Sequence, residues 1–248
     1  MSPPSTSLKQ DGSPRAALAL GPWWGLGLGL LAALMMWGVI QGVHPVFRVP
    51  KKFDVPSIGM PPALFAAHRR EQDRVDRWHA MLYVGGLGLL VAAFLGIGEG
   101  ARRASWLPPL IAPPLGALGG AVGGALGCLV YQYVRENVGQ AGLTHTFLAQ
   151  LLVATPLGLG IGLGLGLATR TASGSIKAAV AGVVAGIVAG AAFPVTISIL
   201  LPAASSDALL PEEGSSRLLW LAILAGMMGL VIPIAGQKGT ELPKHSPP

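Results

Sequence analysis

The residues of this sequence that could carry out chemistry are few, and their spacing matches no catalytic motif. Thr171-Ala-Ser-Gly174 has the small residues of a turn around a serine nucleophile, but it lies in a basic segment without a suitable histidine partner. Gln237-Lys-Gly-Thr240 lacks the preceding glycine of a phosphate-binding loop. We therefore expect a protein that is not an enzyme and that binds no cofactor.

The histidines and the cysteine do not form a metal-binding pattern either. None of the five histidines has the spacing of a helical zinc motif such as HExxH. They are His44, His68, His79, His145 and His245. The single cysteine, Cys128, lies in an apolar segment, where a small buried packing residue is expected and no disulfide can form within the chain. The pattern predicts no metal site.

Polar side chains inside the long apolar stretches are uncharged. These residues are Gln41, Gln132, Thr146, Gln150, Thr155, Thr196 and Ser198. We expect them to form hydrogen bonds between helices, each worth roughly 1 kcal/mol or less. Ion pumps and proton relays usually carry ionisable groups at this depth, so the pattern weighs against an ion-driven pump.

Six uncharged stretches dominate the chain, in which only 11% of residues are charged and 52% are apolar. Each stretch is at least as long as the roughly 20 residues that a helix needs to cross a bilayer. The sequence thus predicts an all-α membrane bundle with spanning helices at 22–43, 79–98, 114–134, 145–168, 178–201 and 218–236. The third helix is expected to start near Pro114, because prolines disfavour a helix interior and 104–113 contains Pro108, Pro109 and Pro113.

The segments between and beyond these helices are polar. Residues 1–21 and 237–248 are predicted to be disordered tails. The segment 44–78 begins with a proline-rich extended part and ends in a helix that runs into the second span. In this helix Asp73 is spaced to pair with Arg69 and Arg77. The segment is either a solvated helix next to the membrane or a docking surface for a partner.

Glycines recur at every fourth position in three of the predicted spans. Such rows let helix backbones approach closely, so the sequence predicts helix packing through them. The residues are Gly116, Gly120, Gly124, Gly158, Gly162, Gly166, Gly182, Gly186 and Gly190. Five of ten residues are identical between Gly96–Ser105 and Gly164–Ser173, which indicates a parallel repeat of two helices joined by a basic turn.

Basic residues predict the orientation in the membrane. With six spans, both tails and both basic turns lie on one side of the membrane. This side carries eight Lys or Arg residues, and the four in the turns are Arg102, Arg103, Arg170 and Lys177. The other side has two such residues outside 44–78, which itself carries seven. The positive-inside rule then predicts cytoplasmic termini, with these four basic side chains at lipid headgroups. The net charge of +6 belongs to the loops and suggests lipid rather than nucleic acid.

The pattern of helix, basic turn and glycine-rich helix at 79–130 and 150–195 resembles the glycine-zipper modules of uncharacterised bacterial membrane proteins, which are sometimes appended to forkhead-associated domains. The resemblance covers about half of the chain, implies a bacterial cytoplasmic membrane and brings no catalytic residues with it. The sequence therefore favours a non-enzymatic scaffold or assembly component that packs with another membrane protein or with its own copies. The alternative is a small channel or permease with a glycine-lined path between the repeats.

Overall fold

The computed structural model describes residues 22–50, 61–137, 143–200, 209–211 and 213–237, and this part of the chain forms six α-helices and no strand. The helices are α1 (Pro22–Val43), α2 (Pro62–Arg103), α3 (Leu107–Asn137), α4 (Leu143–Leu167), α5 (Ala172–Leu200) and α6 (Gly214–Gln237). All six are long and apolar enough to cross a membrane. The all-α fold of six helices is thus confirmed, whereas both predicted tails, except Gln237, lie outside the described residues.

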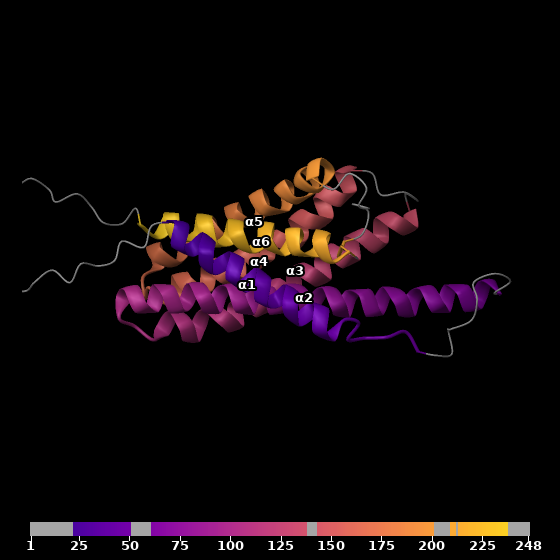
Figure 1. The fold of residues 1–248 in the computed structure, drawn as a ribbon, viewed down its shortest axis with the longest axis horizontal. Coiled ribbons are helices and arrows are strands. Elements are labelled where there is room, and N and C mark those ends of the chain that lie inside the picture. The colour runs from indigo at the N-terminus through magenta and orange to yellow at the C-terminus, as the bar shows by residue number, and fades with distance from the viewer. Residues whose placement is uncertain (1–21, 51–60, 138–142, 201–208, 212, 238–248) are drawn as a thin grey trace, which may run out of the picture.

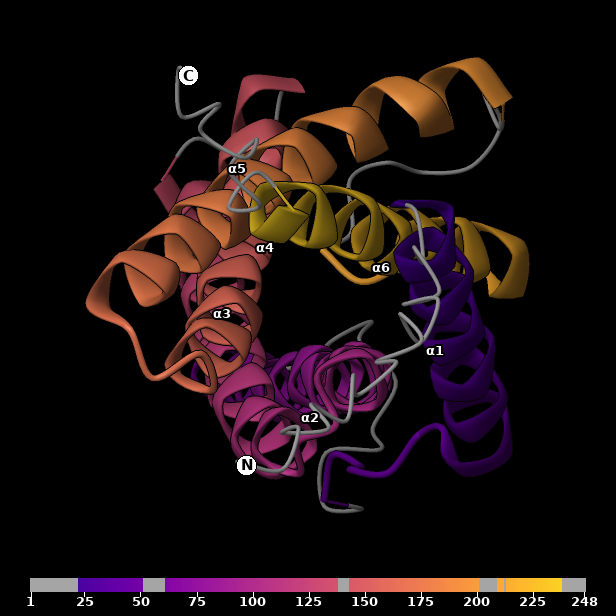
Figure 2. The same ribbon diagram turned by 90° about the vertical axis from the view of Figure 1, so that its left-hand side faces the viewer.

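Successive helices run in opposite directions along the long axis of the molecule (Figure 1). Each helix contacts the next one along the chain, and α1 also contacts α6, so the six helices close into a ring when seen end-on (Figure 2). One end of the bundle carries the α2–α3 and α4–α5 turns, and we call it the basic end. The other end, where α1 ends and α6 begins, is called the polar end below.

The start of α3 differs from the prediction. The helix begins at Leu107 and continues through Pro113 and Pro114, seven residues before the expected start. Pro108 and Pro109 fall in its first turn, where amide hydrogens have no partner within the helix in any case. Prolines farther along are tolerated in membrane helices because neighbouring helices hold the backbone in place. Here Pro108 and Pro109 lie directly against Gly96 of α2.

Helix α2 is unusually long and extends beyond the rest of the bundle at the polar end (Figure 1). Its 42 residues form one unbroken helix of about 63 Å, roughly twice the thickness of the hydrocarbon core. The predicted helix at the end of 44–78 and the predicted second span are therefore parts of the same straight element. We refer to Pro62–Trp78 as the projecting half of α2.

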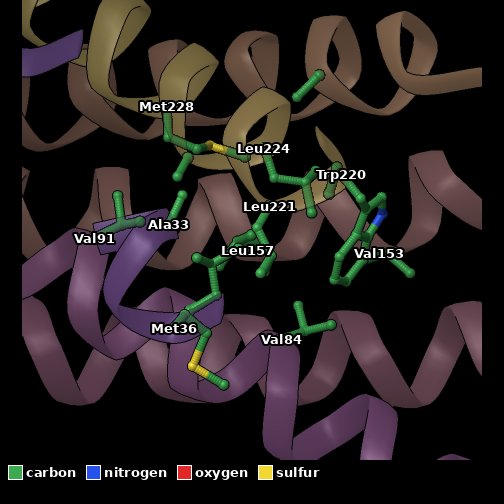
Figure 3. Close-up of a cluster of buried hydrophobic side chains, with 14 of the residues drawn as sticks. Ala33, Met36, Val84, Val91, Val153, Leu157, Trp220, Leu221, Leu224 and Met228 are labelled. Atoms are coloured by element: carbon green, nitrogen blue, oxygen red, sulfur yellow. The ribbon is translucent and has the colours of Figure 1, made fainter. Parts of the chain in front are cut away.

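Large apolar side chains fill the middle of the ring. Trp220, Leu221, Leu224 and Met228 point inward from α6 and meet Leu157 of α4 (Figure 3). Met36 of α1 and Val84 and Val91 of α2 complete the cluster. The opening between the ribbons in Figure 2 is thus occupied by a packed core.

The outer surface of the bundle is apolar as well. Exposed aliphatic residues occur along α1, α3 and α5, such as Leu34, Leu118 and Val184. A helix that is apolar on every face is typical of a membrane span. Together with the length of the helices, this surface identifies a multi-pass membrane protein in contact with lipid.

Candidate functional site

The nine glycines predicted to pack helices all lie against a neighbouring helix. A Cβ atom built on any of them would come within 3.0 Å of a backbone atom of that helix. Gly116, Gly120 and Gly124 face α2. The glycines predicted in α4 and α5 face each other's helix, and Gly158 and Gly182 meet directly. Any larger residue at these positions would push two backbones apart.

Other glycines that were not predicted to pack helices have the same role. Gly119 and Gly160 meet where α3 crosses α4, and Gly25 and Gly229 meet where α1 crosses α6. The alternation of glycine along α4 therefore serves two neighbours, since one row faces α5 and the other faces α3. The sequence shows that glycine recurs at every second position here. Which neighbouring helix each of the two glycine rows faces depends on the arrangement of the helices.

The two helix hairpins are similar but not identical in register. Gly116 faces Gly88 in the first hairpin, and Gly182 faces Gly158 in the second. A strict repeat, with Gly164 equivalent to Gly96, would place Pro156 opposite Gly182. The residue that Gly182 actually faces is Gly158, two residues after Pro156. The internal repeat therefore stays a prediction.

At the basic end, the predicted headgroup residues occupy both turns. Arg102 Nη2 lies 2.6 Å from Glu99 Oε1, and Arg103 pairs with the same carboxylate. The two arginines thus share one negative charge, a partner that the sequence analysis did not assign to them. Arg170 has a positive φ of 57° in the second turn, and Lys177 is exposed one turn into α5.

At the polar end, side chains form hydrogen bonds between helices. Gln150 of α4 is completely buried, accepts a hydrogen bond from Trp220 Nε1 at 2.8 Å and donates one to the Leu209 carbonyl at 3.1 Å. Trp37 Nε1 of α1 donates to the carbonyl of Gly214 at 2.9 Å. These bonds connect α1, α4 and the start of α6 at one level of the bundle.

A second group of polar residues joins α2 to the end of α3. Asp73 forms an ion pair with Arg135 rather than with Arg69 or Arg77, which corrects the predicted pairing. The two helices form a hairpin in which Asp73 comes 30 residues before Arg103 and Arg135 comes 32 residues after it, so they meet at the same height.

Gln132 of α3 completes this group. Its amide nitrogen donates to the Asp73 carbonyl at 2.7 Å and contacts Cys128 Sγ at 3.2 Å, and its oxygen accepts from Arg77 at 3.0 Å. The predicted interhelical role of this glutamine is confirmed, and Cys128 is buried as expected. By contrast, Ser198 bonds to the Pro194 carbonyl of its own helix at 2.7 Å.

A third group lies where the chain leaves α1 and runs along α2. Phe47 N–H donates to His79 Nε2 at 3.0 Å, and His44 Nδ1 lies 2.7 Å from the Tyr83 hydroxyl. The rings of His44 and His79 are 5.5 Å apart. Burial, and to a smaller extent the charge of Arg217, lowers the pKa of His44 below its usual value of 6.5.

The chemistry available at the polar end is hydrogen bonding and proton binding. Within the described ranges, no three His, Cys, Asp or Glu residues gather into a group that could hold a metal ion. In the sequence, His44 and His79 were candidates only for a metal site, and their contact with each other was not predicted. The only signal for it was their position on either side of the predicted loop segment, since His44 is its first residue and His79 directly follows its last.

A scan against protein-family models found no match to this chain. Searches of curated proteins and of solved structures found no match either. The resemblance to glycine-zipper modules stays a prediction from the sequence.

Proposed function

We propose that this protein is a non-enzymatic membrane scaffold that presents the projecting half of α2 to another membrane protein. The observation that carries the proposal is the unbroken course of α2 from the bundle to Pro62. Because the helix does not bend at the membrane boundary, it can hold a partner at a defined distance from the bilayer.

The attachment of this helix also supports a scaffold. Asp73 is held by Arg135 through its side chain and by Gln132 through its carbonyl oxygen. These two bonds fix the projecting half to the end of α3, outside the glycine contacts. The outer positions Phe65 and Arg70 remain exposed and free to meet a partner.

The packing of the bundle favours a scaffold over the alternative, a small channel or permease. A glycine-lined path requires glycines that face open space, whereas the nine predicted glycines face neighbouring backbones. Leu157, Leu224 and Met228 occupy the middle of the ring. We place the protein in the bacterial cytoplasmic membrane with both termini in the cytoplasm, as the positive-inside rule suggests.

Photocrosslinking in native membranes tests the proposal. A photoreactive amino acid at Phe65 or Arg70 should yield a discrete adduct with a protein, and an adduct with a second copy of this chain counts as such a protein. The same amino acid at Val184, which is exposed on the membrane-embedded part of α5, is the matched control and should give lipid adducts. If the α2 positions give no protein adduct and reconstituted vesicles show solute flux, the channel alternative replaces the scaffold.

A further inference from the structure

The hydrogen bond between Phe47 and His79 depends on the protonation state of an imidazole. His79 Nε2 accepts the Phe47 amide hydrogen at 3.0 Å, and a ring nitrogen can accept only when it carries no proton. His79 is buried, with 6% of its surface exposed, and His44 and Phe47 of the segment His44–Pro50 lie against its ring. The ring of Phe47 lies over it, with centroids 5.3 Å apart.

Further titratable and charged groups face this contact. His44 belongs to the same covering segment, and its ring is 5.5 Å from that of His79. Tyr83 of α2 stacks on His79, with centroids also 5.5 Å apart, and contacts His44. Arg217 of α6 acts electrostatically on both His44 and Tyr83. Asp76 lies three residues before His79 on the same helix.

We propose that His44–Pro50 is a pH-sensitive strap, which is bound to α2 at neutral pH and released in acid when His79 takes up a proton. Protonation places a hydrogen on Nε2, where it points at the Phe47 amide hydrogen, and the bond is lost. A proton on His44 adds repulsion across the 5.5 Å between the two rings. His44 itself can keep its bond with Tyr83, because a hydroxyl can either donate or accept.

Release of the strap changes the surface next to the projecting half of α2. Phe47 also contacts Trp78, at 6.3 Å between ring centroids, so both aromatic rings lose a neighbour together. The face of α2 at His79 and Tyr83 then becomes accessible from the aqueous side. This inference does not depend on the scaffold proposal, since the strap and its contacts are part of the isolated chain.

Hydrogen exchange of the Phe47 amide tests the proposal in the full chain, reconstituted in nanodiscs. The protection factor, corrected for the intrinsic effect of pH on exchange, should fall about 5- to 10-fold between pH 7.5 and pH 5, which is what the loss of one hydrogen bond of about 1 kcal/mol produces. Amides of α4 around Leu157 serve as the internal reference and should keep their protection.

Two variants separate His79 from other causes. His79→Gln retains an acceptor that does not titrate, so the Phe47 amide should stay protected at both pH values. His79→Phe has no acceptor and should leave this amide unprotected at both. A fall with pH that persists in His79→Gln would assign the effect to another group and overturn the proposal, as would constant protection in the unmodified chain.

Discussion

Helix α4 meets its neighbours in two different ways. Against α5 and α3 the backbones touch, through Gly158 and Gly160. Against α6 the contact is made by side chains, where Gln150 binds Trp220 and Leu157 belongs to the same apolar cluster as Leu221 and Leu224. We call these two kinds of contact glycine seams and side-chain seams.

The two seams tolerate change differently. In a glycine seam an added atom meets a backbone that belongs to another helix, so the whole helix must shift. In a side-chain seam an added atom can be accommodated by a rotamer, but a lost hydrogen bond leaves a buried polar group without a partner. The contact of α1 with α2 is of the second kind, since Gly86 faces the flexible end of Met36.

The largest effect is expected when a glycine seam is filled. Gly120→Leu places four carbon atoms where a Cβ alone would come within 3.0 Å of the Val84 carbonyl. We expect a loss of about 3 kcal/mol or more, or no folded protein, because overpacking a tight contact forces the backbones apart. The temperature at which the detergent-solubilised protein aggregates, followed by size-exclusion chromatography, measures this.

The matched control for this prediction is Gly38→Leu. Nothing lies within 4 Å of a Cβ built on Gly38, which is exposed on α1. The aggregation temperature should therefore stay near that of the unmodified chain. Equal losses in both variants would mean that the seams are no more sensitive than the lipid-facing surface, and the distinction would fail.

The next largest effect is expected in the side-chain seam between α4 and α6. Gln150→Leu is similar in size but removes the acceptor for Trp220 Nε1 and the donor to the Leu209 carbonyl. Leaving these buried groups without partners should cost about 1–3 kcal/mol. Thermal unfolding in the same detergent gives the value. Gln41→Leu, at an exposed site on α1, should change it by much less, and a similar loss there would refute the assignment.

A smaller effect is expected where the α2–α3 seam leaves the membrane and becomes polar. Asp73→Asn keeps the size of the side chain and removes the charge that pairs with Arg135. We expect a loss of about 1 kcal/mol, reduced by salt, since the pair is only partly shielded from water. Glu71→Gln removes the partner of Arg74, whose side chain is 67% exposed, and should be nearly neutral. If both substitutions lowered the stability equally, the ion pair between α2 and α3 would stabilise the protein no more than an exposed surface pair does.

Much of the fold could be predicted from the sequence. The length and apolarity of each stretch predict a spanning helix, and α1 has the bounds that were expected. The start of α3 was wrong, because the rule against proline in a helix interior was derived for helices in water. In the bundle, the contact of Pro108 with Gly96 helps to hold that part of α3 against α2.

The polar end was largely hidden from sequence reasoning. Gln150 and Trp220 are 70 residues apart, and nothing in either stretch identifies the other as its partner. Asp73 and Arg135 could have been paired by counting outward from the α2–α3 turn, but the pairs within the helix had the stronger local signal. Contacts that close the ring depend on the arrangement of all six helices.

The smallest effect is expected at Gly86, which is only two residues from Gly88 in the same turn of α2. A Cβ on Gly86 would lie 2.9 Å from the terminal methyl carbon of Met36, which can move aside, so Gly86→Ala should change stability by less than about 0.5 kcal/mol. A Cβ on Gly88 would come within 3.0 Å of the Gly116 carbonyl, so Gly88→Ala should cost about 1–3 kcal/mol. Both substitutions raise the intrinsic helix propensity equally. Any difference in unfolding temperature between the two variants is therefore caused by the contact with the neighbouring helix and not by the glycine content of α2. Equal unfolding temperatures would contradict the distinction between the two kinds of seam.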